Sequence, residues 1–355
     1  MVLKHRINRT LQLLLNDLSE KVSVNSTQWK AELGELIETG LPAAPSDLVI
    51  ATLNGVMGDA LAERRSRLAQ TLGFSSQMGR LSLDSLTLAG QLVSPQPRIA
   101  ICVHGWCMND SQWQRKPHDH GRSLVQFGYS PVYLRYNTGR HISQNGEDFA
   151  LMLEQLVQAW PCEVKEIVLI GHSMGGLVCR SACFYAARHQ VGWLKKLATL
   201  MTLGSPHNGA PLAQMASWIE ARSASVPYLR PFSNLTGMRS AGSKDLSRGV
   251  ICHSDWERDP PYTSQMRPPL PDHVACFAIA SCLSRSVEEE RNRRIGDGLV
   301  PVSSALGEAT PHQLAVEFPP ENQWVGGGIT HMELLTHPKV AMQIQGWVLG
   351  NSLSV

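Results

Sequence analysis

The chain has 355 residues, of which 43% are hydrophobic and 17% are charged, and these proportions are ordinary for a soluble globular protein with a full-sized core. Its formal net charge is only +2 at pH 7 and no basic run is interleaved with aromatic residues, which argues against a nucleic-acid partner. No segment approaches the roughly 20 consecutive apolar residues of a membrane span.

Helical periodicity dominates the N-terminal part of the chain. Apolar residues recur every three or four positions over Ile7–Leu18 and Trp29–Glu38, and Ser46 caps a third expected helix from Asp47 to about Leu72. Because this region has no catalytic pattern, we expect residues 1–80 to form a helical extension that packs on the main domain or mediates self-association.

The first residues and the cysteines indicate the compartment. The first apolar run is interrupted by polar residues at positions 12, 16 and 17, so it is too short and too amphipathic for a secretory signal. The eight cysteines include no C-x-x-C pair and fit free buried thiols, although Cys252 could bridge to Cys276 or Cys282 in an exported protein. We therefore expect a cytoplasmic protein that needs no metal or other cofactor.

The middle of the chain alternates between strand and helix patterns. Leu81, Leu83, Leu86 and Leu88 suggest short strands, and the regular alternation then starts at Arg98. It predicts an α/β fold, with a mostly parallel sheet and helices on both faces. The expected strands are Ile99–Val103, Val132–Tyr136, Ile167–Ile170 and Leu197–Leu203, and the expected helices are Ser111–Phe127, Glu147–Trp160 and Met174–His189.

Residues 207–272 interrupt this alternation. They are rich in Pro, Ser and Arg, yet they contain more large apolar side chains than a plain loop would expose. We interpret them as a cap or lid inserted into a main domain that covers residues 81–355. The strand pattern then resumes at His273–Ser281, with another strand expected near Leu314–Phe318 and a closing helix over Pro338–Leu349.

The stretch Gly171-His172-Ser173-Met174-Gly175 has the G-x-S-x-G pattern of a nucleophile elbow. It follows an apolar strand pattern and opens a helical one, which is the context that such an elbow requires. The turn exposes the hydroxyl of Ser173 and directs the backbone N–H of Met174 toward the same space. We therefore predict Ser173 as a nucleophile that attacks a carbonyl carbon.

A serine hydroxyl needs a histidine base and an acid that orients the imidazole. In α/β hydrolases the acid follows the serine in the chain and the histidine comes last. Asp297, in a Gly-Asp-Gly turn, and His331, in a glycine-rich loop before the last helix, satisfy this order.

Other histidines fit these roles less well. His172 is part of the elbow, and we expect its side chain to point away from the pocket. His207 is the main rival as the base, but it precedes any suitable acid in the chain. His118 and His120 resemble a pair of metal ligands without a convergent third ligand, so we expect no metal site.

The oxyanion hole needs a second backbone donor besides Met174. The expected strand Ile99–Val103 is followed by His104-Gly105-Trp106. Its position predicts the backbone N–H of Trp106 as that donor.

With these residues, the chain resembles α/β-hydrolase-fold lipases and esterases, in particular the lipase-like group that includes the GPI inositol-deacylase (PGAP1-like) proteins. The resemblance covers about residues 98–350 and implies Ser173, Asp297 and His331 as the triad, with Trp106 and Met174 as oxyanion donors. The matching stretches are Val103–Trp106, Gly171–Gly176, Leu203–Gly209, Asp297–Ser304 and Thr330-His331.

The function expected first is hydrolysis of carboxylic esters through an acyl-enzyme. A thioesterase or acyltransferase could use the same triad, since the fold and the triad do not fix the acyl group. The alternative from another class is a catalytically silent hydrolase fold that serves as a binding module.

The apolar side chains of the cap indicate the substrate. Phe232 and Leu235 are candidate substrate-binding residues, and they predict a preference for esters with an apolar acyl or alcohol part. Their alternative role is a small core within the cap itself. The same apolar surface leaves open a peripheral contact with membranes or lipid.

Overall fold

A computed structural model describes residues 45–114, 118–225, 240–262, 267–310 and 312–352. The helices predicted at Ile7–Leu18 and Trp29–Glu38 lie outside the described residues, as do Phe232 and Leu235. Within the described ranges, none of the helices combines the length and the apolar character that a membrane span requires.

An eight-stranded sheet forms the centre of the protein, in the order β2-β1-β4-β3-β5-β6-β7-β8. Strands β3 to β8 run parallel to one another, whereas β1 is antiparallel to β4 and to β2. The strands are β1 (Gly73–Ser76), β2 (Gly79–Arg80), β3 (Arg98–Val103), β4 (Tyr129–Arg135), β5 (Glu166–His172), β6 (Leu197–Leu203), β7 (Ala275–Cys282) and β8 (Gln323–Gly327).

Both faces of the central strands are buried, because the residues that point to either face of the sheet are apolar. In β3, Ile99, Ile101 and Val103 belong to one core cluster, whereas Ala100 and Cys102 belong to the cluster on the opposite face. Helices therefore have to cover the sheet on both sides.

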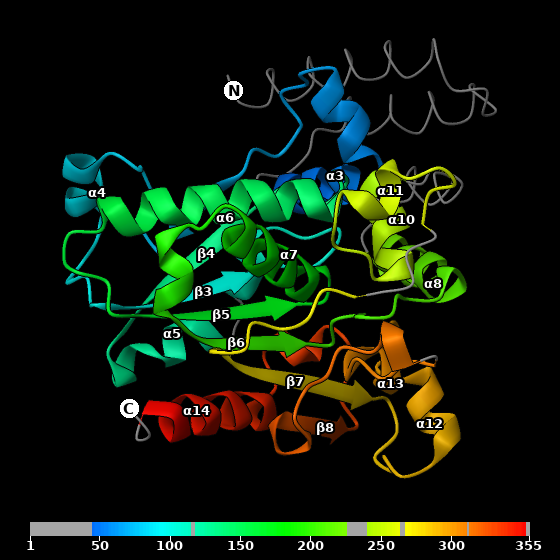
Figure 1. Ribbon diagram of the computed structural model, residues 1–355. Helices are drawn as coiled ribbons and strands as arrows, with labels where there is room; N and C mark the ends of the chain where they lie inside the picture. The colour runs from blue at the N-terminus through cyan, green and yellow to red at the C-terminus, as the bar shows by residue number, and fades with distance from the viewer. Residues whose placement is uncertain (1–44, 115–117, 226–239, 263–266, 311, 353–355) are drawn as a thin grey trace.

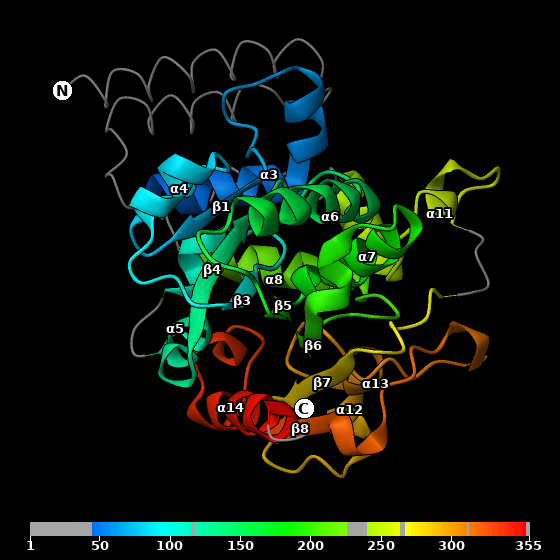
Figure 2. The ribbon, with the colours of Figure 1, turned by 60° about the vertical axis from the view of Figure 1, so that its left-hand side comes forward.

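Two sets of helices do so (Figures 1 and 2). One face carries α3 (Pro45–Glu63), α4 (Ser85–Gln91), α6 (Ile142–Ala159) and α7 (Met174–Arg188), and the other carries α5 (His120–Ser123) and α14 (Pro338–Ser352). This arrangement confirms the predicted α/β-hydrolase architecture, a mostly parallel sheet between two helical layers.

The inserted segment and the N-terminal part meet at the carboxyl end of the sheet. Between β6 and β7, the chain forms α8 (Leu212–Ser225), α10 (Ala241–Arg248) and α11 (Ser254–Glu257), and Figure 1 shows these helices beyond the ends of the central strands. Helix α10 packs against α3. Two short helices, α12 (Glu290–Ile295) and α13 (Val302–Ala305), follow β7 at the same end.

The sheet begins before residue 81, within the range predicted as the extension. Strand β1 pairs with β4, with Phe74 opposite Leu134. Helix α3 ends at Glu63 rather than near residue 72 and contains a break at Met57, where φ is −143° and ψ is 21°. Within α3, the side chain of Asn54 accepts a hydrogen bond from the backbone N–H of Gln70 at 2.8 Å, which fastens the connection between α3 and β1 to the helix.

Two strand predictions are wrong. The leucines at 81–88 lead into helix α4, because Asp84 caps it by accepting from Thr87 N and the spacing of three between Leu83 and Leu86 breaks strand alternation. Residues Leu314–Phe318 form no strand, since Val316 and Phe318 are buried in an irregular segment. The last strand is β8, which contains two glycines that lower its strand propensity.

The helix predicted over Ser111–Phe127 is also wrong as a single element. Within the described residues it forms three short helices: η1 (Asp110–Trp113), α5 and η2 (Val125–Phe127). The reason lies in local capping, because Asp119 accepts from Arg122 N and starts a new helix inside the apolar pattern.

Candidate active site

Ser173 lies between the last residue of β5 and the first residue of α7. Its φ is 55° and its ψ is −126°, a strained conformation for a residue with a side chain. Helix α7 approaches the sheet closely here, because a Cβ on Gly175 would lie 2.2 Å from the carbonyl oxygen of Val103. The predicted elbow is therefore present, and its glycine is required by this contact.

Asp297 and His331 lie in the segments that follow β7 and β8, and their side chains contact each other. His331 Nδ1 donates to Asp297 Oδ2 at 2.7 Å, and both side chains are buried. Asp297 Oδ1 accepts from the backbone N–H groups of Leu299 and Val300 at 3.0 Å and 2.8 Å. The carboxylate is thus held at both oxygens, and it fixes the imidazole with its proton on Nδ1.

Close contacts bring this pair to the elbow. A Cβ on Gly204, at the end of β6, would lie 2.9 Å from Asp297 Oδ2 and 3.3 Å from His331 Nδ1. The rings of His172 and His331 are 4.7 Å apart, and His172 Nε2 donates to the carbonyl oxygen of His331 at 2.9 Å. The His172 side chain therefore lies beside the His331 loop.

Ser173 and His331, the predicted nucleophile and the predicted base, are not hydrogen-bonded to each other in the described part of the chain. The hydrogen bonds among the described residues include none between Ser173 Oγ and His331 Nε2. In free enzymes such a contact is often long and shortens when substrate binds.

The loop after β3 lies against Ser173. A Cβ on Gly105 would be 2.9 Å from the Cβ of Ser173, so the chain just before Trp106 passes close to the predicted nucleophile. The buried imidazole of His104 fixes this turn, because Nδ1 donates to Gly105 O at 3.0 Å and Nε2 accepts from Tyr136 N at 3.3 Å. Burial lowers the pKa of His104 to about 4, so the ring is neutral, as this pattern of one donor and one acceptor requires.

The family model of the PGAP1-like alpha/beta domain matches residues 142–261, which run from α6 through the elbow into the segment inserted between β6 and β7. The resemblance predicted from the motifs is thereby confirmed for this segment. This chain is an α/β-hydrolase-fold protein. The search of curated proteins gave no match to the sequence.

Solved structures of the α/β-hydrolase fold are similar to this chain at low identity. The lipase BlEst2 of Bacillus licheniformis, in its mature form, is 16% identical, with 79% of this chain and 97% of that chain covered and a TM-score of 0.45. The esterase Pf2001 of Pyrococcus furiosus is 15% identical, with 72% and 81% covered and a TM-score of 0.40. YbtT, a type II thioesterase from the yersiniabactin pathway, is 14% identical, with 73% and 94% covered and a TM-score of 0.42.

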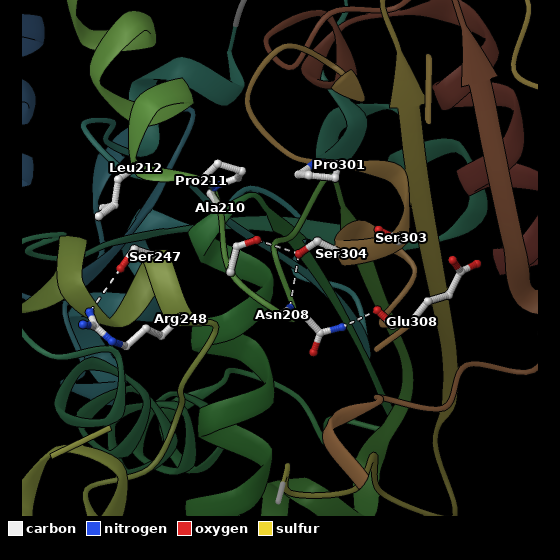
Figure 3. A pocket seen from close by; sticks show the side chains of 11 residues that line it. Asn208, Ala210, Pro211, Leu212, Ser247, Arg248, Pro301, Ser303, Ser304 and Glu308 are labelled. Atoms are coloured by element: carbon white, nitrogen blue, oxygen red, sulfur yellow. Dashed lines mark hydrogen bonds between the residues drawn. The ribbon is translucent and has the colours of Figure 1, made fainter. Parts of the chain in front are cut away.

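Two further stretches of this α/β-hydrolase domain meet, one directly after β6 and the other in and after α13. The backbone N–H of Asn208, after β6, donates to Ser304 Oγ at 3.2 Å, and Ser304 Oγ donates to Gly209 O at 2.7 Å. Asn208 Nδ2 also donates to the carbonyl of Glu308 at 2.8 Å. Figure 3 shows these bonds in a pocket that Ser247 and Arg248 of α10 line from the other side.

His207 is placed for a structural role in this fold. Its ring is fully buried, Nδ1 accepts from Arg180 Nη1 at 3.3 Å, and Nε2 donates to Thr202 Oγ1 at 3.2 Å. Burial and the neighbouring guanidinium of Arg180 hold the pKa of His207 well below its ordinary value. Both ring nitrogens are occupied, so this rival of His331 has no lone pair to offer a serine.

His118 and His120 bond to each other instead of converging on one point. His118 Nε2 lies 3.0 Å from His120 Nδ1, and His120 Nε2 donates to Leu334 O at 2.8 Å. The His120 bond reaches the loop that carries His331. In the sequence these two histidines resembled a pair of metal ligands, and no local signal identified Leu334 as the partner of His120.

Proposed function

We propose that this protein hydrolyses carboxylic esters through an acyl-enzyme formed on Ser173. The observation that carries the proposal is the strained elbow serine beside a buried Asp297–His331 pair at the same end of the sheet. A strained nucleophile turn and a fixed imidazole both cost stability, so a fold that keeps both favours catalysis over a silent binding module.

In the proposed mechanism, Ser173 Oγ attacks the carbonyl carbon of the ester while its proton passes to His331 Nε2. Asp297 keeps the other imidazole proton on Nδ1 and stabilises the imidazolium that forms. The carbonyl oxygen becomes an oxyanion and accepts hydrogen bonds from the backbone N–H groups of Met174 and Trp106. His331 then protonates the leaving alcohol, and water cleaves the acyl-enzyme by the same steps in reverse order.

The substrate class in this proposal is an ester with an apolar acyl or alcohol part. The indole rings of Trp106 and Trp218, the latter on α8, lie 6.0 Å apart, and Met215 of the same helix is buried. These side chains support an apolar surround for the loop beside the nucleophile. We propose that Phe232 and Leu235 also bind the apolar part of the substrate. The proposal includes a peripheral contact with lipid and a cytoplasmic location.

A fluorophosphonate probe tests the nucleophile. We expect the wild type to be labelled, Ser173→Ala to be unlabelled, and Ser205→Ala to be labelled, since Ser205 is a matched buried serine after the neighbouring strand. Labelling that persists in Ser173→Ala, or a wild type that takes no label, would overturn the proposal. Rates on p-nitrophenyl esters, matched thioesters and an added acceptor alcohol then separate an esterase from a thioesterase and an acyltransferase.

A further inference from the structure

The helix α3 lies outside the segment matched by the family model, yet it touches the loop that is proposed to hold the oxyanion. Trp106 Nε1 donates to the backbone carbonyl of Gly55 at 2.9 Å. Two neighbours of Trp106 also bond to α3: Cys107 Sγ to Thr52 O at 3.9 Å and Asn109 Nδ2 to Asp47 O at 3.3 Å. Backbone carbonyls along one helix therefore hold the whole loop.

The carbonyl of Gly55 has a second side-chain donor. Ser240 Oγ, at the start of α10, donates to it at 2.7 Å, and the next residue bonds to α3 through Ala241 N and Asp59 Oδ2 at 2.8 Å. Helix α3 departs from helical geometry at Met57, two residues after Gly55. Side chains donate to carbonyls on both sides of this break, since Asn137 Nδ2 donates to the carbonyl of Gly58. One acceptor thus joins the oxyanion loop and the entrance to α10.

Packing restricts the loop further. A Cβ on Gly55 would lie 2.2 Å from Cys107 Sγ and 3.0 Å from the Cys107 backbone, so the loop and helix are in direct backbone contact. Cys107 itself has a φ of 56°, which is uncommon for a residue with a side chain. The loop keeps this conformation because its neighbours hold it on both sides.

We propose that α3 is part of the catalytic apparatus, in which the carbonyl of Gly55 positions Trp106 and thereby the backbone N–H that receives the oxyanion. This inference rests on the proposed function. Because the oxyanion exists only in the transition state, a shift of this donor lowers kcat and leaves KM nearly unchanged. Gly55 and the indole of Trp106 are positioning groups, since neither touches the reacting atoms.

The test compares Trp106→Phe with Trp193→Phe in the full-length protein. Both substitutions keep a buried aromatic ring and remove an indole bond to a backbone carbonyl, since Trp193 Nε1 donates to Ala150 O at 2.9 Å. We expect kcat of Trp106→Phe to fall about 10- to 100-fold at unchanged KM, because a misplaced oxyanion donor acts only on the transition state. Trp193→Phe should keep the wild-type kcat.

An alkyl boronic acid provides a readout that a merely structural role would not move. Its tetrahedral adduct with Ser173 places an oxygen where the oxyanion forms, so its inhibition constant should rise in Trp106→Phe by the same factor as kcat/KM falls. A second comparison sets Gly55→Ala against the control Gly90→Ala, because a Cβ added at Gly90 would meet nothing within 4 Å. Gly55→Ala should lower kcat in the same way, and where it does not fold, Trp106→Phe decides.

The outcomes separate this inference from the proposed function. If the wild type takes the fluorophosphonate label and hydrolyses esters but Trp106→Phe has the same kcat and boronate inhibition, the role of α3 is wrong and the esterase proposal stands. Equal losses in Trp106→Phe and Trp193→Phe would also overturn it, because they would indicate a general effect on stability. If the wild type neither labels nor turns over, both proposals fall.

Discussion

His120 donates a hydrogen bond from Nε2 to the backbone carbonyl of Leu334, 2.8 Å away and 214 residues further along the chain. Leu334 follows His331 by one turn, and His172 bonds to the carbonyl of His331 itself. Two buried imidazoles from separate segments therefore brace the loop that carries the proposed base. Burial lowers the pKa of His120 to about 3, so this ring braces the loop in its neutral form.

The neutral state of His120 predicts a loss of stability in acid. In the unfolded chain the imidazole of His120 is protonated below its ordinary pKa of 6.5, whereas in the folded chain it stays neutral down to about pH 3. The free energy of unfolding therefore falls as pH is lowered through this window, by about 1.4 kcal/mol per pH unit for this group. His120→Gln keeps a donor without titrating, so urea unfolding should show a shallower pH slope by that amount. Curves for His120→Gln that run parallel to those of the wild type would contradict the assignment.

Asp297→Asn is expected to lower kcat by roughly 10⁴-fold. The backbone N–H groups of Leu299 and Val300 point at Oδ1 and retain the amide oxygen there. The amide NH₂ must then face His331 Nδ1, which forces the imidazole proton onto Nε2 and removes the lone pair that Ser173 needs. His331→Ala should lose about as much or more. Rates with p-nitrophenyl butyrate check both, and activity that survives in either but disappears in His207→Gln would require another triad.

The strained backbone at Ser173 predicts that two substitutions which both abolish activity will differ in stability. Ser173→Ala and Ser173→Gly should both abolish turnover, by on the order of 10⁶-fold. Glycine adopts a φ of 55° without strain, so Ser173→Gly should be more stable than Ser173→Ala by about 1 kcal/mol. Thermal unfolding of the two variants measures this difference, and equal melting temperatures would show that the elbow is not strained.

All eight cysteines are predicted to be free thiols. None of the eight forms a disulfide bond in the described part of the chain, and Cys162 is half-buried whereas the others are buried. A thiol reagent should therefore count close to eight groups in denatured, unreduced protein and at most about one at early times in the native protein. A denatured count near six would indicate a disulfide bridge.

Phe232→Ala or Leu235→Ala should change the ranking of ester chain lengths, if these side chains contact the acyl group as proposed. Each would bury roughly 1.5–3 kcal/mol of apolar surface against a substrate, enough to shift specificity several-fold. Leu246→Ala is the matched control, because Leu246 is fully buried in the core from α10 and should affect only the melting temperature. An unchanged ranking across four chain lengths, with a lower melting temperature, would assign Phe232 and Leu235 to the core of the cap.

The sequence by itself determined the features that depend on neighbouring residues. Apolar residues at successive positions of β3 and β5 predicted strands buried on both faces. The glycines beside Ser173 marked a close approach of helix and sheet, and those beside Asp297 marked a turn with positive φ. The known order of a triad in this fold then predicted Ser173, Asp297 and His331 as its members. In the structure, His331 Nδ1 lies 2.7 Å from Asp297 Oδ2.

Only the tertiary structure decided the features that depend on distant partners. Strand β8 contains two glycines and forms because it pairs with β7, while the leucines at 81–88 lie in a loop and a capped helix. The bonds from Trp106 to Gly55 and from His120 to Leu334 join residues 51 and 214 positions apart. No local periodicity encodes such contacts, because they form only when folding has brought separate segments against the same end of the sheet.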